Sequence, residues 1–469
     1  MTTSAPPLPA AAAAELTELR ERLDGALATP GEPAYDALRA SWNLTFDQRP
    51  ALVVEADGPD DVVAAVAFAA RHELTVAAQS TGHGAAVACD GGLLVRTGRM
   101  RTVEVDAAAR TARIGAGARW TDVLPATAPL GLSPLLGFNP HVGVVGYTLG
   151  GGLGWLQRRH GLAVDAVVAL DAVLPDGRRV RVTPEREPDL FWALRGAAGS
   201  FAVVVAIELR LVAVPELFGG MVLYPGERAA EVLAAYRGWI DGLTDDVTSS
   251  VAVLRVPPLP QVPQPLRGRT LVTVSACALA GPERAAELLA PVRELGDPVA
   301  DLFRPLGPGD LGEVAMDPVD PMPAAGHAVT VAALNDEVAA LVAGAAAGEQ
   351  PFAIVELRHL GGAVDRPGAP CALARPDGQL LLHVEAPMPP GPPGAAAHGA
   401  LRELAARMAP LATGTVLPSF LGEVETGPER VAQAYAADGR DRLAALKRAH
   451  DPGWRLRFGR PIPSGWAVR

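Results

Sequence analysis

Lysine is almost absent from this chain of 469 residues: Lys447 is the only one, and arginine supplies the other basic side chains. A phosphate-binding GxxxxGK loop is therefore excluded, and Lys447 is the only lysine available for a Schiff base. Cysteine is also scarce. Cys89, Cys277 and Cys371 are far apart and form no CxxC pair, which argues against a disulfide framework and against a zinc knuckle.

Other common signatures are missing as well. The chain has no HExxH and no GxSxG motif, and His141, His160 and His450 lack metal-ligand spacing. No apolar run approaches the 20 residues of a membrane span, and the N-terminus has no basic region typical of a signal peptide. The net charge of −11 argues against nonspecific nucleic-acid binding. We therefore expect a cytoplasmic protein with no metal, nucleic-acid or membrane partner.

The chain does contain enough apolar sequence, 49% hydrophobic residues, for two or three domains with real cores. Residues 49–56 and 74–79 are predicted strands, and Gly58-Pro59-Asp60-Asp61 starts a helix between them, so a parallel β-α-β unit is expected. The segments GLLVRT, TVEVD and TARIGAG, from residue 91 onward, predict a meander of short strands. A helix over residues 119–130 and an apolar strand over 202–212 follow.

The second half has a different composition. Proline-rich stretches at 256–265 and 387–394 predict surface loops. Around them lie the strand candidates LVTVSACALA, AIVELRHL and LLLHVEA, with helices near 281–295 and 331–346. We therefore predict an α+β protein with a first domain over residues 1–215 (1–13 disordered), a second over 216–424, and a closing helix and coil over 425–469.

Glycine is concentrated in GFNPHVGVVGYTLGGGLGW (137–155), which holds seven glycines in nineteen positions. Such a backbone exposes N–H groups in a nest that suits an anion such as a pyrophosphate. The stretch lacks GxGxxG spacing, so a glycine-rich turn without a ligand is the alternative. Gly82-His83-Gly84 and Gly115-Ala116-Gly117 fall in the same 75 residues, each after a strand. This arrangement favours several loops that converge on one dinucleotide.

A resemblance to a known family rests on four segments in this order: RPALVVEADGPDDVVAAVAFAARHELTVAAQSTGHG, VDAAARTARIGAGARWTDV, GGGLGWLQRRHGLAVDAVVALDAVLPDGR and EPDLFWALRGAAGSFAVVVAIELRL. They resemble the FAD-binding domain of the vanillyl-alcohol oxidase/PCMH flavoprotein superfamily, above all its berberine-bridge-enzyme-like branch. YAADGRDRLAALKRAHDPGWRLRFGRPIP resembles the segment with which that branch returns to the FAD domain. The middle of the chain is matched chiefly by HLGGA (359–363). The resemblance implies a two-domain PCMH-type fold whose second domain, an antiparallel sheet covered by helices, binds the substrate.

The resemblance also implies an FAD whose isoalloxazine ring lies between the domains. In the family, the histidine of the Gly-His motif is bonded to the flavin 8α-methyl group, and this position is His83. Imidazole offers a nucleophilic nitrogen near neutral pH, and the flanking Gly82 and Gly84 let the loop lie against a flat ring. The cysteine that forms a second flavin bond in the branch is Asn139 here, so a single bond is expected.

The family's RGGGH reads QSTGH in this chain, which removes an arginine but leaves polar residues for phosphate oxygens. The further residues expected to contact FAD are Gln79, Ser80, Thr81, Ala85, Gly117, His141, Val142, Gly143, Gly146, Tyr147, Gly150, Gly151, Gly152, Gly154, Val204 and Phe458.

Candidate catalytic residues come from the strand LLLHVEA, where His383 and Glu385 share a face. The resemblance implies that this strand presents acid-base residues to the flavin; a solvated strand edge is the alternative. Tyr435 falls where the family has a tyrosine that acts on substrate hydroxyls, although a structural role explains it equally. Glu356 and Arg358 also share a face, but an ordinary strand-surface pair accounts for them as well.

Val142 stands where the branch has a residue that gates oxygen, and a valine there favours molecular oxygen as the electron acceptor. The sequence therefore predicts an FAD-dependent oxidase, with FAD held by one histidine, that oxidises an alcohol, an amine or an activated C–H group of a small organic substrate. A step that tailors a secondary metabolite is the expected setting. The alternatives are a flavin-containing enzyme of non-redox cyclisation, isomerisation or elimination, and a family member that binds a ligand without turnover.

Overall fold

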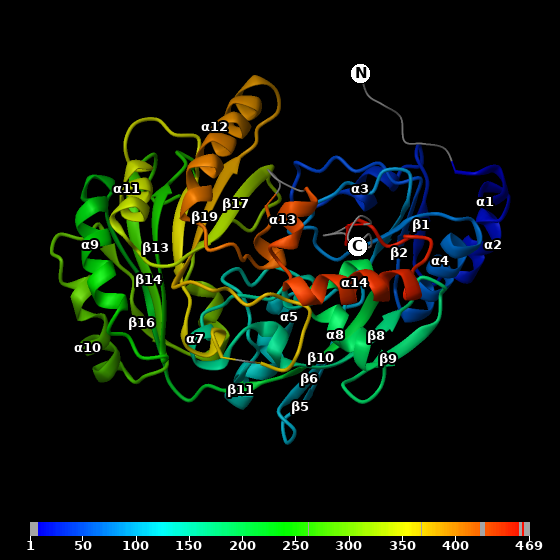
Figure 1. The fold of residues 1–469 in the computed structure, drawn as a ribbon, viewed down its shortest axis with the longest axis horizontal. Helices are drawn as coiled ribbons and strands as arrows, with labels where there is room; N and C mark the ends of the chain where they lie inside the picture. The colour runs from blue at the N-terminus through cyan, green and yellow to red at the C-terminus, as the bar shows by residue number, and fades with distance from the viewer. Residues whose placement is uncertain (1–7, 261, 367, 423–426, 459–461, 464–469) are drawn as a thin grey trace.

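The computed structural model describes residues 8–260, 262–366, 368–422, 427–458 and 462–463. It contains one large sheet, on the left in Figure 1, and smaller sheets on the right. The mixture of helices and sheets is the α+β class that the sequence predicts. The division into domains at residues 215 and 424 stays a prediction.

The first sheet has the strand order β1 (Ala26–Ala28), β2 (Leu52–Glu55), β4 (Leu93–Arg96) and β3 (Val76–Gln79). β2 and β3 each pair in parallel with β4, and α4 (Pro59–Arg71) lies between them in sequence, so the predicted parallel β-α-β unit is confirmed. The prediction that GLLVRT belongs to a meander is wrong, because β4 inserts between β2 and β3. Its Leu93, Leu94 and Val95 are all buried, as expected for a central parallel strand covered on both faces.

The N-terminal segment is more ordered than predicted. It forms α1 (Ala10–Ala14), α2 (Leu16–Arg22) and α3 (Tyr35–Arg39). The predicted disorder is wrong for residues 10–13, because alanine favours the helix and Ala12 is buried in the apolar core that includes α4. Residues 1–7 of that prediction lie outside the described part of the chain.

The second sheet is antiparallel, with the order β5 (Val103–Asp106), β6 (Thr111–Gly115), β10 (Val203–Arg210), β8 (Val167–Val173) and β9 (Arg179–Val182). A small pair, β7 (Leu132–Ser133) and β11 (Val212–Ala213), lies beside it in sequence. The helices of this region are α5 (Trp120–Thr127), α6 (Val144–Leu149), α7 (Gln157–His160) and α8 (Pro188–Ala197). The helix predicted over 119–130 ends as an α-helix at Thr127, and a single tighter turn follows.

The third sheet has eight strands: β15 (Ala300–Asp301), β12 (Leu217–Pro225), β14 (Thr270–Ala278), β13 (Val247–Arg255), β18 (Ile354–His359), β19 (Leu380–Pro387) and β17 (Ala324–Val331), with β16 (Arg304–Leu306) paired to β12. All of its pairs are antiparallel. The helices α9 (Ala229–Ile240), α10 (Pro282–Arg293), α11 (Asp336–Gly344) and α12 (Pro392–Met408) cover its outer face (Figure 1). The predicted antiparallel sheet covered by helices is confirmed.

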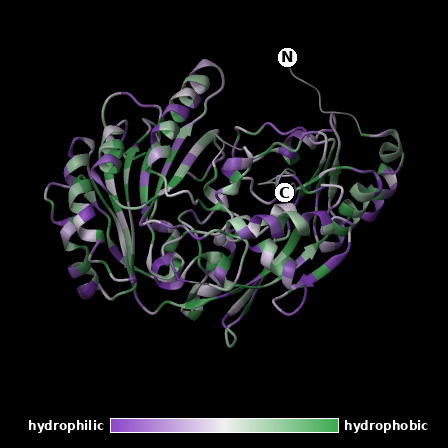
Figure 2. Cartoon of the chain, viewed as in Figure 1, coloured by the Kyte–Doolittle hydropathy of each residue, from purple (hydrophilic) through white to green (hydrophobic). Residues whose placement is uncertain are grey.

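Alternation along the strands separates two cores. In β19, Leu382 and Val384 belong to the core under the covering helices, whereas Leu381 belongs to the core shared with the second sheet. The strands of both halves are correspondingly apolar in Figure 2. The loop predicted at 387–394 is partly wrong, because α12 begins at Pro392; proline is well tolerated in the first turn of a helix.

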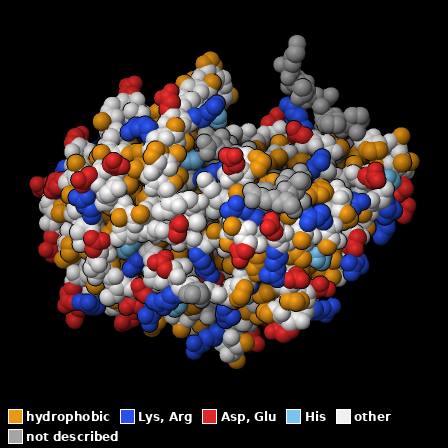
Figure 3. Space-filling view, viewed as in Figure 1, with side chains coloured by type: hydrophobic (Ala, Val, Ile, Leu, Met, Phe, Trp, Pro, Cys, Tyr) orange, Lys and Arg blue, Asp and Glu red, His pale blue; other side chains and the backbone are white. Residues whose placement is uncertain are grey.

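The C-terminal part contains α13 (Pro428–Ala432) and α14 (Ala437–His450), and α14 packs against α8. After α14 the chain returns to the first sheet, where Leu456 pairs in parallel with Val76. Both signs of charge are interspersed over the face shown in Figure 3. Among the described helices, none combines the length and the apolar character needed to cross a bilayer.

Candidate active site

A cavity of about 490 Å³ lies between the smaller sheets and the eight-stranded sheet. One wall comes from the loop after β3, from the glycine-rich stretch and from residues 196–204. The other wall comes from Asp317, Arg358 on β18, and residues 418–420. A concave site of this size, mostly apolar and made by separate parts of the chain, is typical of a small-molecule or cofactor site.

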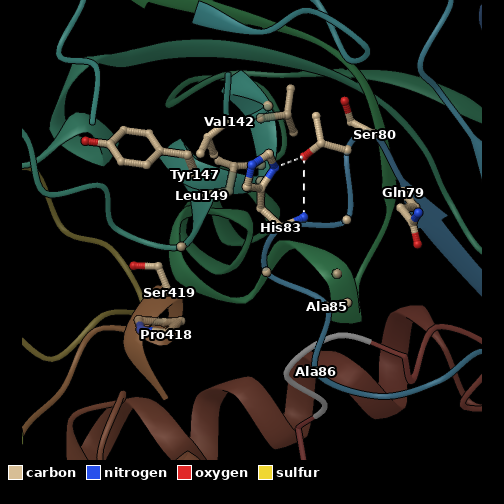
Figure 4. Close-up of a pocket in the computed structure, with 18 of the residues that line it drawn as sticks. Gln79, Ser80, His83, Ala85, Ala86, Val142, Tyr147, Leu149, Pro418 and Ser419 are labelled. Atoms are coloured by element: carbon tan, nitrogen blue, oxygen red, sulfur yellow. Dashed lines mark hydrogen bonds between the residues drawn. The ribbon is translucent and has the colours of Figure 1, made fainter. Parts of the chain in front are cut away.

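The loop after β3 begins at the carboxyl end of a parallel strand, where ligands of such sheets commonly bind. It turns sharply at Gly82, whose φ is 83° and whose missing Cβ would lie 2.9 Å from Gln79 Nε2. Gln79 is used by the fold: its Oε1 accepts from Gln48 Nε2 (2.8 Å) and its Nε2 donates to Ala40 O (3.0 Å). Its side chain points away from His83 in Figure 4.

His83 lies in the middle of the pocket wall (Figure 4). Its Nδ1 is 2.9 Å from Thr81 Oγ1, and its ring stacks on Trp42 with centroids 4.1 Å apart and planes at 14°. Its Nε2 is buried and has no hydrogen-bond partner among the described residues. Burial, followed by the charges of Arg119 and His141, lowers the pKa of His83 to about 4, so the imidazole is neutral at pH 7.

The glycine-rich stretch has two parts with different roles. Gly143 and Gly146, around the start of α6, face the pocket. Gly154 serves packing instead, because a Cβ there would lie 1.7 Å from Leu136 O. Close approach of backbone to backbone therefore explains part of the glycine content without a ligand.

Most predicted cofactor residues line the pocket: Gln79, Ser80, Thr81, Gly82, His83, Gly84, Ala85, Asn139, Val142, Gly143, Gly146, Tyr147, Gly150, Val204 and Phe458. The remaining ones, Gly117, His141, Gly151, Gly152 and Gly154, are not among the described lining residues. Gly117 packs against Thr97 O, at 2.0 Å from its missing Cβ.

Arg358 forms the centre of the opposite wall. Its Nε donates to Glu356 Oε2 (2.7 Å), and the two side chains are only 13% and 6% exposed. Its guanidinium carbon lies 4.1 Å from the centre of the Phe138 ring, which in turn stacks on Trp155 with centroids 3.9 Å apart. A surface ion pair, the interpretation that the sequence left open, does not describe these residues. The sequence signal that could have placed Glu356 and Arg358 in the site was the presence of two charged residues in an otherwise apolar strand.

Asp317 lies on the loop between β16 and β17 and is an exposed residue of the pocket wall. Desolvation by the surrounding protein atoms raises the pKa of its carboxyl to about 6. The charge of Arg358 lowers this pKa, and the charge of Glu356 raises it. Asn139 Nδ2 donates to Pro318 O (3.1 Å), which ties this loop to the glycine-rich wall. The sequence offered no motif around Asp317.

The predicted catalytic residues lie outside the described pocket lining. His383 and Glu385 share a face of β19, as their spacing predicts, and His383 packs behind Phe420 with ring centroids 5.7 Å apart. Burial, then Arg358 and His327, lowers the pKa of His383 to about 3. Tyr435 is buried, and its hydroxyl donates to Gly196 O (3.2 Å). The fold therefore does not bring the three together around one point of the pocket, and their catalytic roles stay predictions.

Comparison with known proteins points to the cofactor. Residues 50–183 match the family described as FAD binding domain. The chain is 29% identical to (R)-6-hydroxynicotine oxidase of Paenarthrobacter nicotinovorans over 60% of each protein, and 33% identical to the FAD-linked oxidoreductase pgmH of Aspergillus terreus over 47% of this chain and 46% of that protein. The alignments thus cover about half of the length of these curated relatives.

Solved structures extend the likeness to the whole chain. The structure of 6-hydroxy-D-nicotine oxidase from Arthrobacter nicotinovorans has a TM-score of 0.81 and 27% identity, and covers 94% of this chain and 98% of that one. A chitooligosaccharide oxidase has the same TM-score at 20% identity, with 96% and 99% covered, which shows a shared fold alone.

Proposed function

Because this chain belongs to the PCMH-type superfamily of FAD-binding proteins, with its FAD-binding domain at residues 50–183, we propose that it is an FAD-dependent oxidase. It holds FAD through a single bond to His83 and oxidises an alcohol, an amine or an activated C–H group of a small organic substrate, with molecular oxygen as electron acceptor. The names of its curated relatives, (R)-6-hydroxynicotine oxidase and the FAD-linked oxidoreductase pgmH, support oxidation of small molecules.

The observation that carries this proposal is the state of His83. Its imidazole is neutral, one nitrogen is held by Thr81, and the other is buried in the pocket wall without a partner. A neutral nitrogen retains the lone pair that a bond to carbon requires. Stacking on Trp42 holds the ring in one orientation. Bound FAD supplies a two-electron acceptor in this pocket.

A bond from His83 to FAD would replace one N–H bond of the imidazole and one C–H bond of the flavin 8α-methyl group by a C–N bond. Two protons would be released, and the two electrons would pass through the flavin to oxygen. A second attachment is not expected, because the nearest equivalent of the family's cysteine is Asn139. Its amide nitrogen is a poor nucleophile and already donates a hydrogen bond to Pro318 O.

Acid precipitation of the purified protein tests the attachment. The yellow colour is expected to stay with the polypeptide, and the peptide containing His83 is expected to carry the mass of FAD. In the His83→Ala variant the colour should move to the supernatant. His141→Ala is the matched control, because His141 is close enough to help lower the pKa of His83 but is not among the described lining residues, and the colour of this variant should stay with the polypeptide. Release of colour from the unmodified protein would contradict the covalent bond.

Anaerobic mixing with candidate substrates tests the oxidase activity. A substrate is expected to bleach the flavin absorbance, and the admission of air should restore it. Product formation with an unchanged flavin spectrum would instead support the non-redox alternative. Reduction without recovery in air would contradict oxygen as the acceptor.

A further inference from the structure

The pocket contains a carboxylate without a partner. Asp317 forms no hydrogen bond or ion pair within the described part of the chain, although it lines the wall opposite the glycine-rich stretch. Its loop is held from two sides, since Asn139 donates to Pro318 O (3.1 Å) and Trp42 Nε1 donates to Val319 O (3.0 Å). Trp42 is also the ring that stacks on His83. The loop of Asp317 is therefore tied to the opposite wall of the pocket, which contains His83 and the glycine-rich stretch and which we call the cofactor wall.

Arg358 presents unused donors to the same pocket. Its Nε is occupied by Glu356, and no hydrogen bond to its two terminal nitrogens is found among the described residues. The guanidinium lies 4.1 Å from the centre of the Phe138 ring and 5.3 Å from that of Phe420. These two rings hold the plane of the fork, so its free N–H groups are directed rather than mobile.

Asp317 and Arg358 line the same pocket, and the charge of Arg358 acts on Asp317. Hydrogen-bond chemistry restricts the substrate group that both side chains can bind. A carboxylate only accepts, and a guanidinium only donates. An aliphatic amine is mostly an ammonium at neutral pH and in that form has no lone pair for Arg358, and a carboxylate substrate has no proton for Asp317. A hydroxyl group serves both, because it donates one hydrogen and accepts on its oxygen.

We propose that Asp317 accepts the proton of a substrate hydroxyl while Arg358 donates to the same oxygen, so that the substrate is an alcohol. This inference rests on the proposed oxidase function and narrows it. In the step, the hydroxyl proton passes to the Asp317 carboxylate. The carbon that bears the hydroxyl gives up its hydrogen with two electrons to the bound FAD. The products are a carbonyl compound, protonated Asp317 and the two-electron-reduced cofactor.

The ionisation of Asp317 suits this role. A carboxyl with a pKa of about 6 is ionised at neutral pH and is basic enough to take part in proton transfer. The charged groups that act on it are Arg358, which lowers the pKa, and Glu356, which raises it. Burial keeps His383 neutral nearby on β19, so His383 does not add charge there.

Exposed apolar side chains near Asp317 favour one kind of alcohol. Val87 lines the pocket and is 39% exposed, whereas Met316 and Val319, which are not among the described lining residues, flank Asp317 on its loop at 55% and 54% exposed. Leu44, two residues after Trp42, is 49% exposed. Large hydrophobic side chains around the Asp317 loop favour an apolar ligand body over a sugar, which needs polar contacts along its length.

A matched panel tests the substrate class on the holoenzyme. Flavin reduction is followed anaerobically with benzyl alcohol and 1-octanol, with benzylamine and octylamine of the same skeletons, and with cellobiose. The alcohols are expected to reduce the flavin faster than the amines and cellobiose. Reduction by an amine but by no alcohol would overturn the hydroxyl assignment and leave the oxidase proposal intact. Reduction by none of the probes would count against the proposed oxidase function itself.

Asp317→Asn tests the residue. The first-order rate of flavin reduction by alcohol is expected to fall by about 10²–10⁴-fold, the usual contribution of a general base, with FAD content unchanged. Asp320→Asn is the matched control, since Asp320 is exposed on the same loop, is not among the described lining residues, and should leave the rate unchanged.

The pH profile separates catalysis from a structural role. In the unmodified protein the reduction rate should rise with pH through about 6, as Asp317 loses its proton, and this limb should be missing in Asp317→Asn. Arg358→Lys, which keeps the charge but loses the fork, should weaken alcohol binding and retain the limb. A wild-type rate and pH profile in Asp317→Asn would overturn the assignment of Asp317.

Discussion

Replacement of the single lysine is expected to destabilise the protein strongly. The Lys447 ammonium is 1% exposed and uses all three hydrogens, which it donates to Asp451 Oδ2 (2.6 Å), Ser200 O (2.5 Å) and Leu456 O (2.8 Å). Lys447→Met keeps the volume of the chain but removes the charge. It leaves the Asp451 carboxylate, which is fully buried, without its cation, and leaves two carbonyls without this donor.

The magnitude follows from these contacts. Removal of one partner of a buried ion pair costs about 3–5 kcal/mol, because the other charge stays buried and unpaired. Asp451 keeps two backbone donors, Arg455 N (3.0 Å) and Leu456 N (3.0 Å), so the lower half of this range is expected. The double variant Lys447→Met/Asp451→Asn removes both charges and should cost less than the sum of the single changes, by about 0.5–3 kcal/mol.

Urea unfolding of the holoprotein, followed by tryptophan and flavin fluorescence, measures these free energies. Arg448→Met is the matched control: Arg448 is the next residue of α14 and is exposed, so its loss should change stability by less than about 0.5 kcal/mol. A loss of under about 1 kcal/mol for Lys447→Met would refute the reasoning, because a buried and paired ammonium cannot be removed at the cost of a surface contact.

Two further predictions concern the fold around the site. In urea unfolding, Gly154→Ala should destabilise the protein by about 1–3 kcal/mol, and it should weaken FAD retention, since its Cβ would meet Leu136 O at 1.7 Å. Gly238→Ala in α9, with nothing within 4 Å, is the control and should be neutral or stabilising in the same measurement. Burial lowers the pKa of His327 to about 4 and that of His359 to about 3, below the ordinary 6.5. The folded protein therefore favours the neutral imidazoles, so the free energy of unfolding is highest above pH 6.5 and decreases as the pH falls. At pH 5 each should cost about 2 kcal/mol in urea unfolding, and equal stability at pH 5 and 7.5 would contradict this.

Much of the cofactor wall could be predicted from the sequence. The loop around His83 and the glycines of residues 137–155 are continuous motifs, and the strand and helix patterns on either side of them depend on neighbours only a few residues away. The parallel pairing around α4 follows from the length of the crossover. Local propensity and short motifs carry such information, because the interactions that they encode are close in sequence.

The other wall of the pocket, formed by Asp317, Arg358 and residues 418–420, was decided by the tertiary structure. Asp317 is an ordinary loop aspartate in the sequence, and it gains a raised pKa only because distant segments surround it. Arg358 becomes part of the pocket because β18 faces Phe138, more than two hundred residues earlier in the chain. The insertion of β4 between β2 and β3, and the packing role of Gly154, were likewise invisible. Burial and exposure of single side chains depend on long-range packing, which neither periodicity nor a motif records.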